Sequence, residues 1–360
     1  MSLPLQGIKV VELGQLIAGP FAAKILAEFG AEVIKVEPPL TGDPLRKWRL
    51  LHNGTSVWWA VQSRNKQSVT LDLRQPQAQE MVRRLIRDAD VLVENFRPGT
   101  LEGWGLSWEA LHALNPKLIM LRVSGYGQTG PYRDRPGFGV IGVLLALRHR
   151  EQNGGEGQQI DVALYESVFN MMESLIPEYS VFDTVREPAG SSLPGIAPSN
   201  AYRCNDGKYA LIAGNGDSIF RRLMEKIGRM DLARDPELQH NDGRVRHVAR
   251  IDAAISTWTA ERSMDEVLAA LNEARIPAGK IYDAADIASD PHYQARDMLL
   301  QGTLDDGTPV TLPGIVPKLQ ATPGQVTSSA PTLGQHTDAV LEAHGIDAAT
   351  RAEWRRLGII

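Results

Sequence analysis

The sequence predicts an α/β protein in which an open sheet of parallel strands forms the larger part, with a smaller α+β domain after it. Three observations lead to this class. In the first half, short β-rich apolar runs alternate with longer helical patterns. Glycine and proline stand between these segments, where the chain must turn. After residue 200, a hairpin and several helices follow one another without that alternation.

The first unit of the sheet lies at the N-terminus. Ile8–Leu13 (IKVVEL) predicts a strand, the loop GQLIAGP follows, and FAAKILAEFG predicts a helix that Pro20 starts and Gly30 ends. Glu32–Glu37 predicts the next strand. A strand, a helix and a second strand in this order form the β-α-β unit of a parallel sheet.

The same alternation continues to residue 124. The sequence predicts further strands and helices at Ser68–Leu73, Gln75–Ala89, Val91–Asn95, Trp108–Leu114 and Leu118–Ser124. In the later region, AYRCNDGKYALIAG predicts a hairpin that turns at residues 205–207. Asp217 is expected to cap the next helix, and Ser263 with Glu266 predicts a capping box for DEVLAALNEA.

Composition excludes several classes of function. The 360-residue chain has a net charge of -5 and no long run of either sign, which argues against nucleic acid as a partner. Its single cysteine, Cys204, allows no intrachain disulfide, and the eight histidines show no metal-binding spacing, so we expect no metal. No signal peptide or membrane-length apolar run is visible. We therefore expect a soluble, cytoplasmic protein that binds no membrane.

Polar and glycine-rich motifs follow several of the predicted strands. The loop GQLIAGP does not match GxGxxG, so NAD is not expected as a cofactor. Leu71–Arg74, Asn95–Gly99 and Ser124–Pro131 end three other strands and offer amides, cations and close backbone approach. Each motif alone is equally compatible with an ordinary turn. Because the carboxyl ends of parallel strands share one edge, together they predict a nucleotide or phosphate site there.

Seven segments of the chain, taken together, resemble those of the family III CoA-transferases, also called the CaiB–BaiF family. The segments occur in family order and are PLQGIKVVELGQLIAGPFAAKILAEFGAEVIKVEPP, NKQSVTLDL, VENFRPGTLEGWGL, LIMLRVSGYGQTGPY, GQQIDVALYESVF, PSNAYRCNDGKY and LGQHTDAVL. The resemblance implies a doubly wound, Rossmann-like open sheet in a large domain made of residues 1–198 and 311–360. It also implies a small domain at 199–310 and an interlocked homodimer.

The resemblance further implies an activity and a set of contacts. The expected activity is transfer of CoA from an acyl-CoA thioester to a carboxylic acid through covalent aspartyl intermediates. The expected CoA contacts are Gln15, Ile17, Ala18, Leu71, Asp72, Leu73, Arg74, Asn95, Phe96, Arg97, Pro136, Gly137, Phe138 and Gly139. A Gly-rich loop that shields the intermediates would fall at Pro194–Asn200, although this chain has only Gly195 there. Some members carry Gln at the position of Ile17, so one oxyanion donor is absent.

A seam between Gly142 and Val143 bears on the catalytic residue. In the family, a stretch like Phe138–Gly142 continues for some tens of residues, which include the nucleophilic aspartate, before a second GVIG-like stretch. Here Gly142 runs directly into an apolar helix pattern, Val143–Leu147, without a capping residue. The segment therefore belongs to the protein but not to this sequence, or is deleted, or its nucleophile is replaced, and the intact remainder of the chain favours the first explanation. Asp161 is the candidate for replacement, but it matches a strand aspartate whose expected role is structural.

Two other functions stay open at this point. The α-methylacyl-CoA racemases share the fold and use a His/Asp pair to abstract a proton beside the thioester. Their histidine would follow the GPYR-like turn, where this chain has Arg135–Phe138 and no histidine, which favours the transferase. The third function is a CoA-binding protein without turnover.

Overall fold

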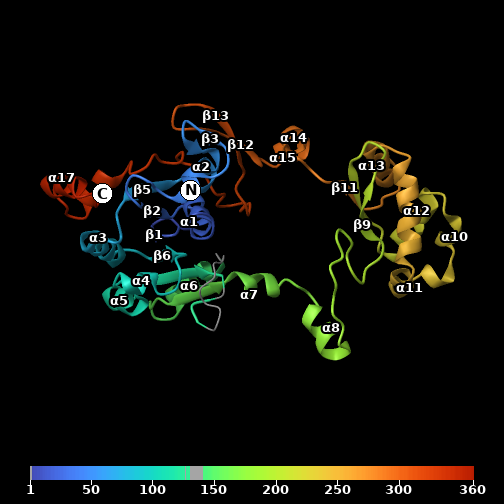
Figure 1. Cartoon of the computed structure of the whole chain (residues 1–360), viewed down its shortest axis with the longest axis horizontal. Coiled ribbons are helices and arrows are strands. Elements are labelled where there is room, and N and C mark those ends of the chain that lie inside the picture. Colours follow the sequence, from blue (N-terminus) through green and yellow to red (C-terminus); the bar gives the residue numbers. More distant parts are fainter. Residues whose placement is uncertain (1, 126, 130–140) are drawn as a thin grey trace. The chain divides into compact units, whose positions relative to one another are not determined.

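The structure, a computed structural model, describes residues 2–125, 127–129 and 141–360, and its elements are labelled in Figure 1. The chain forms two compact units. The large unit consists of Met1–Glu173 and His292–Ile360, and the small unit of Ser174–Pro291. The small unit thus begins and ends earlier in the chain than the small domain predicted at 199–310.

A six-stranded sheet forms the centre of the large unit. Its strand order is β5-β2-β1-β6-β7-β8, and every neighbouring pair is parallel. The strands are β1 (Lys9–Glu12), β2 (Glu32–Glu37), β5 (Lys66–Thr70), β6 (Val91–Glu94), β7 (Ile119–Ser124) and β8 (Gln159–Ala163). The chain winds outward from β1 to β5, then returns beside β1 with β6 and winds to β8. The predicted open parallel sheet is confirmed, and its winding reverses between β1 and β6.

Helices cover both faces of this sheet. On one face, α1 (Ala18–Glu28) and α6 (Ile141–Gln152) pack on side chains such as Val93 and Leu121. On the other face, α3 (Pro76–Arg87), α4 (Thr100–Gly103), α5 (Trp108–Leu114) and α16 (Thr337–Ala343) enclose a core with Leu92 and Met120. Adjacent residues of β6 therefore enter opposite cores, as the alternation of side chains along a strand requires. The C-terminal segment completes the core that the N-terminal half begins.

Shorter elements fill the rest of the large unit. They are the 3-10 helix η1 (Pro44–Lys47), β3 (Leu51–His52), β4 (Thr55–Ser56), α2 (Val57–Gln62), α7 (Leu164–Phe169), α15 (Pro291–Ala295), β12 (Leu299–Thr303), β13 (Pro309–Pro313) and α17 (Ala348–Arg356). One predicted strand is shifted, because β5 covers Lys66–Thr70 rather than Ser68–Leu73. The residues after Thr70 leave the sheet and form a turn, in which Gln75 N–H donates to the Asp72 carbonyl.

The predicted helix start at Val143 is wrong. Helix α6 begins at Ile141 and runs through Gly142 without interruption, so the seam lies inside a helix. The space around Gly142 explains why the helix tolerates it, since an added Cβ would lie 2.9 Å from Cγ2 of Ile160 on β8. Glycine therefore lets α6 pack closely on the sheet. The lack of a capping residue at Val143 consequently carries no weight for a missing segment.

The small unit is an α+β arrangement around a three-stranded antiparallel sheet. Its strand order is β11-β10-β9, with β9 (Ser199–Arg203), β10 (Tyr209–Ala213) and β11 (Ala278–Lys280). The predicted hairpin and the capping box of Ser263 and Glu266 are confirmed. The helices are α8 (Leu175–Phe182), α9 (Asp217–Lys226), α10 (Met230–Ala233), η2 (Pro236–Leu238), α11 (Asn241–Arg246), α12 (Val248–Ala260), α13 (Met264–Glu273) and α14 (Ala284–Ser289). None of the helices that the structure describes is long and apolar enough to cross a membrane.

The expected cap by Asp217 is wrong, and the reason lies in a buried arginine. Asp217 is the first residue of α9 and Gly216 precedes it as the cap, so the carboxylate is free for other partners. It accepts hydrogen bonds from His240 and from Arg244, whose side chain is fully buried. The Arg244 guanidinium also donates to the carbonyl oxygens of Ala197, Asn215, Leu238 and Gln239. One side chain thus joins α11 to three loops of the small unit.

Replacing Arg244 should destabilise the protein strongly. We expect Arg244→Met to lower the free energy of unfolding by about 3 kcal/mol or more, because several buried acceptors lose a charged donor. Arg246→Met on the same helix is the control, because that side chain is 64% exposed and forms an ion pair with the exposed Asp242, so its loss should cost less than about 1 kcal/mol. Urea denaturation measures both. Equal losses for the two variants would contradict this account.

Candidate functional site

Two loops meet where the winding of the sheet reverses. The loop after β1 contains Gly14–Ile17, and the loop after β6 contains Asn95–Arg97. The Asn95 amide joins them, because its Oδ1 accepts from the backbone N–H of Gln15 at 2.7 Å and its Nδ2 donates to the Gln15 carbonyl at 2.9 Å. In open α/β sheets, ligands bind at this reversal, outside the carboxyl ends of the strands.

The close approach of the two loops requires glycine at position 14. A Cβ added there would lie 2.9 Å from Asn95 Oδ1 and 3.1 Å from the Cα of Gly19 in α1. Both distances are shorter than ordinary van der Waals contact. Any side chain at position 14 would therefore displace Asn95 from the backbone of Gln15.

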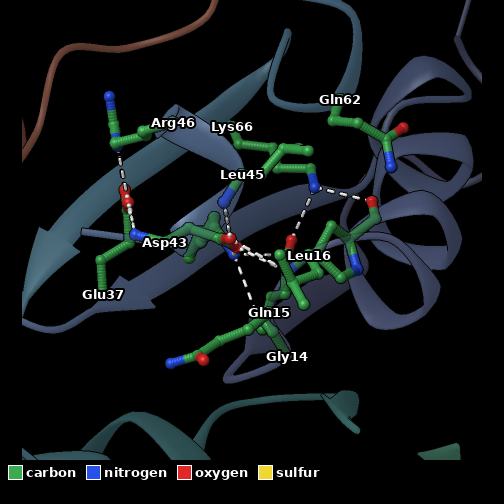
Figure 2. A network of polar contacts seen from close by, with 12 residues as sticks. Gly14, Gln15, Leu16, Glu37, Asp43, Leu45, Arg46, Gln62 and Lys66 are labelled. Carbon is green, nitrogen blue, oxygen red and sulfur yellow. Dashed lines mark hydrogen bonds and ion pairs between the residues drawn. The ribbon is translucent and has the colours of Figure 1, made fainter. Parts of the chain in front are cut away.

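Leu16 has an unusual backbone conformation that Asp43 holds in place. Its φ is +63°, in the left-handed region that side chains other than glycine seldom adopt. Its backbone N–H donates to both oxygens of the Asp43 carboxylate, at 3.0 and 3.2 Å (Figure 2). Asp43 in turn has its own backbone N–H bound to Glu37 Oε2 at 2.9 Å. Asp43, which follows β2, therefore fixes the backbone conformation of the loop after β1.

Lys35 lies beneath this loop and has no unused donor. The ammonium group contacts Glu12 Oε1 at 2.7 Å, the Gly14 carbonyl at 2.8 Å and Asp43 Oδ2 at 2.8 Å. These three acceptors match the three N–H bonds of a lysine. Burial alone would lower the pKa of Lys35, but the surrounding carboxylates outweigh it and hold the pKa above its ordinary value. Lys35 therefore stays charged throughout the physiological range.

The same buried network continues to α1. Lys66 Nζ lies 2.7 Å from Glu12 Oε2 and donates to the Pro20 carbonyl at 2.8 Å. Burial lowers the pKa of Lys66 to about 8, with the attraction of Glu12 opposing the shift. Burial alone would raise the pKa of Asp43. The positive charge of Lys35 and the hydrogen bonds to the carboxylate outweigh that effect and hold the pKa below its ordinary value. The network thus contains a carboxylate that stays ionised under the loop at neutral pH.

A second buried pair lies under the loop after β6. Glu94 accepts from Arg122 Nε at 2.7 Å and, through its other oxygen, from the backbone N–H of Phe96 at 2.8 Å. Arg122 also donates to Glu102 on α4 at 2.7 Å. Burial raises the pKa of Glu94, and the attraction of Arg122 opposes that effect. Both loops of the edge therefore donate a backbone N–H to a buried carboxylate that is paired with a cation.

A pocket of about 490 Å³ opens at this edge of the sheet. Six of the predicted CoA-contact residues line it, namely Gln15, Leu71, Asp72, Leu73, Arg74 and Phe96. Leu13, Pro38, Pro39, Trp104 and Gly358 also line it, and sequence reasoning did not single them out. Arg74 folds back on Asp72, with Nε 2.8 Å from Oδ1, while the rest of its side chain is exposed. The pocket combines apolar walls with a cation at its rim, which suits a nucleotide.

The other predicted contact residues lie apart from this pocket or beyond the described chain. Ile17 and Ala18 line a second, mostly apolar pocket of about 760 Å³ beside Phe21 and Trp58. Arg97 is exposed, and Asn95 is turned toward Gln15. The predicted contacts at Pro136, Gly137, Phe138 and Gly139 lie outside the described residues.

The contacts of Asp161 give it a structural role. It lies on the edge strand β8, and its Oδ2 accepts from the backbone N–H of Gln128 at 2.8 Å. Gly127, with a φ of +85°, would place a Cβ 3.4 Å from the same oxygen. The carboxylate therefore holds the turn that follows β7.

Sequence reasoning missed the residues that shape the edge. Glu12, Lys35 and Asp43 are all buried and stand outside the motifs that follow the predicted strands. A signal was present, because Glu12 and Lys35 are charged residues inside runs predicted as buried parallel strands, where a charge needs a partner. Among the described residues, no group of three or more His, Cys, Asp or Glu side chains is arranged to hold a metal ion.

The chain is similar to several CoA-transferases and to a solved structure of the CAIB/BAIF family. The chain is 45% identical to the succinyl-CoA–D-citramalate CoA-transferase of Chloroflexus aurantiacus over 92% of each chain. It is 33% identical to the succinate–glutarate CoA-transferase of Agrobacterium fabrum, over 94% of this chain and 95% of that protein. A crystal structure of a CAIB/BAIF family protein from Brucella suis superposes with a TM-score of 0.81 at 31% identity, covering 96% of this chain and 100% of that one.

The family match also bears on the seam. The family model described as CoA-transferase family III matches residues 5–143 and, separately, residues 138–337. The overlap, 138–143, contains the junction of Gly142 and Val143. Residues 138–143 therefore match two different parts of the family model. The alignment with the citramalate enzyme has 370 positions and includes 92% of the 360 residues of this chain. About 40 positions of that alignment therefore have no residue of this chain opposite them. The chain belongs to CoA-transferase family III, whose enzymes transfer CoA between an acyl-CoA and a carboxylic acid.

Proposed function

We propose that this chain binds succinyl-CoA or a similar short dicarboxyl-CoA at the edge formed by β1 and β6, and that its acceptor is a small di- or hydroxydicarboxylic acid. The relatives support this substrate class, because they are named as enzymes that pair succinyl-CoA or succinate with citramalate, malate or glutarate. The single observation that carries the CoA site is the pocket lined by Gln15, Leu71–Arg74 and Phe96. Its single cysteine is compatible with the reducing cytoplasm, where we propose that it acts.

The proposed chemistry needs a carboxylate nucleophile. By resemblance, an aspartate attacks the thioester carbonyl and expels CoA, and the CoA thiolate then attacks the aspartyl anhydride and releases the donor acid. The acceptor carboxylate repeats these two steps in reverse. Backbone N–H groups at the strand ends are the groups of the described chain that could stabilise the oxyanions. Asp161 does not fit the nucleophile, because its carboxylate already holds the Gln128 backbone.

A second candidate function follows from the double family match. If the segment between Gly142 and Val143 is absent from the protein, the nucleophile is absent with it, and the chain binds CoA without transferring it. The overlap of the two matches at 138–143 motivates this candidate, and it is equally compatible with a protein that contains the segment. The two candidates share the CoA site and differ only in turnover.

We also propose that the chain forms the interlocked homodimer expected of the family. Large apolar side chains on and near α7 and α8 support this, because they are exposed in the isolated chain. They are Tyr165, Val168, Phe169, Met171, Ile176, Tyr179 and Phe182. The first four belong to the large unit and the last three to the small unit, and monomeric proteins seldom expose so many large apolar side chains within one short stretch of sequence.

CoA binding is the first test. Isothermal titration with CoA or succinyl-CoA should give a dissociation constant in the micromolar range or below. Arg97→Ala should weaken binding by about 1–3 kcal/mol, because an exposed strand-end arginine can form charge-assisted hydrogen bonds to a phosphate. Arg234→Ala, which removes an exposed arginine of the small unit, should leave the affinity unchanged. The absence of any heat with either ligand would refute the CoA site.

The dimer is tested by light scattering at micromolar concentration. We expect the mass of two chains at every dilution, because interlocked chains cannot separate without unfolding. A folded monomer would contradict the proposal.

Turnover is tested by intact mass together with trapping. If the protein contains the missing segment, its mass will exceed 39.5 kDa by several kilodaltons, and hydroxylamine will trap an activated aspartyl or acyl group during CoA transfer. If the mass is 39.5 kDa, we expect CoA binding without transfer. In either case Asp161→Asn should lower stability rather than abolish chemistry. Transfer by a 39.5 kDa chain that Asp161→Asn abolishes without unfolding would make Asp161 the replacement nucleophile.

A further inference from the structure

Two backbone N–H groups at the binding edge donate to carboxylates that no ligand could reach. The Leu16 N–H donates to Asp43, and the Phe96 N–H donates to Glu94. Both carboxylates are at most 1% exposed. Neither belongs to the pocket at the edge. Their oxygens therefore act on the loops and not on a bound molecule.

Each of these carboxylates is paired with a buried cation from a neighbouring strand. Asp43 pairs with Lys35 of β2, at 2.8 Å, and Glu94 pairs with Arg122 of β7, at 2.7 Å. A strand in the middle of a sheet is rigid, so the position of each cation is fixed. A lone carboxylate in this apolar surrounding would bind a proton, whereas a neighbouring cation favours the ionised form, which accepts a stronger hydrogen bond. The same arrangement thus occurs under both loops.

The loop after β1 needs such an acceptor more than an ordinary turn does. Leu16 adopts a left-handed φ, which costs free energy for a residue with a side chain. Its neighbour Gln15 has both backbone groups bound to Asn95. Figure 2 shows the Asp43 side chain directed toward Leu16, with dashed lines that mark the hydrogen bonds from the Leu16 N–H. Without Asp43, the peptide on the N-terminal side of Leu16 would keep its carbonyl bond to Asn95 but lose the acceptor of its N–H, and with it a support of the left-handed φ.

We infer that Asp43 with Lys35, and Glu94 with Arg122, are positioning pairs that set the shape of the two binding loops before CoA arrives. The inference rests on the proposed CoA site, because it assigns these pairs a role in that site. Loops held in the bound shape lose less conformational entropy on binding, so the affinity for CoA depends on residues that never touch it.

A carboxylate at the amino end of β6 offers a control for Glu94 at its carboxyl end. Asp90, which precedes β6, accepts from the backbone N–H of Lys9 at 2.9 Å and from Arg150 at 2.7 Å. It thus has the same two kinds of partner as Glu94 and lies at the other end of the same strand. The Asp90 side chain is 25% exposed, so its loss should cost less stability. A purely structural role would lower stability in the variants without weakening CoA binding selectively in Asp43→Ala and Glu94→Gln.

The experiment compares Asp43→Ala, Glu94→Gln and Asp90→Ala with the unchanged protein. Titration with CoA should show affinity weaker by about tenfold or more for the first two variants and within about twofold for Asp90→Ala. Hydrogen exchange of the free protein should rise in peptides covering 13–18 for Asp43→Ala and 95–98 for Glu94→Gln, and in neither for Asp90→Ala. Asp43→Asn, which keeps the side-chain size and one acceptor oxygen, should retain more affinity and protection than Asp43→Ala.

The outcomes separate the two claims. If the unchanged protein binds no CoA, the proposed function fails, while the exchange data on the free protein still test the positioning role. If Asp43→Ala and Glu94→Gln bind CoA as Asp90→Ala does, or if exchange rises uniformly along the chain, the positioning role is wrong. Should Asp43→Ala not fold, the isosteric Asp43→Asn and Glu94→Gln carry the same test, with the same contradicting result.

Discussion

The ammonium group of Lys35 is the contact on which the binding edge depends. It is buried in the sheet and satisfied by Glu12, the Gly14 carbonyl and Asp43, so it links β1, β2 and the loop that follows each of them. Removing one partner from a buried ion pair leaves an uncompensated charge, which costs several kcal/mol. The network around it balances three carboxylates, Glu12, Glu37 and Asp43, against Lys35, Lys66 and Arg46. The loops after β1 and β2 are therefore held together by a network of paired charges and are not independent turns.

The parts of the site that follow from local patterns could be predicted from the sequence. The convergence of Gln15, Leu71–Arg74 and Phe96 on one pocket is a consequence of parallel strands sharing an edge, and the sequence shows where those strands end. Asp43 could not be found in this way. It precedes Pro44 in a turn and also accepts from the N–H of Leu45, which is the behaviour of an ordinary cap. Its contact with Leu16, 27 residues earlier, depends on the packing of the whole sheet.

Two expectations failed for a similar reason. Asp217 has the residue type and position of a helix cap, but a buried arginine 27 residues later competes for its carboxylate. The helix that was expected to begin at Val143 begins at Ile141, because packing against Ile160 overrides the low helix propensity of Gly142. In both cases a tertiary contact decided a question that local propensity could not.

The junction of Gly142 and Val143 bears on the transfer of CoA and not on the proposed binding of CoA. The described residues of the large unit contain a pocket and two loops that are bound to buried carboxylates, whereas we propose that the family's nucleophile has no counterpart among the 360 residues. Asp161 is the nearest carboxylate in the sequence, and its contact with Gln128 gives it a structural role. Binding and transfer are thus two properties that this chain could possess separately.

The central claim is that CoA binds at the edge formed by the loops after β1 and β6. The most direct measurement is hydrogen exchange of the unchanged protein with and without saturating CoA. Our account predicts new protection in the peptides that cover residues 13–18, 71–75 and 95–98, and little change at the amino ends of the strands. Protection that lies elsewhere, with those three segments unchanged, would contradict it.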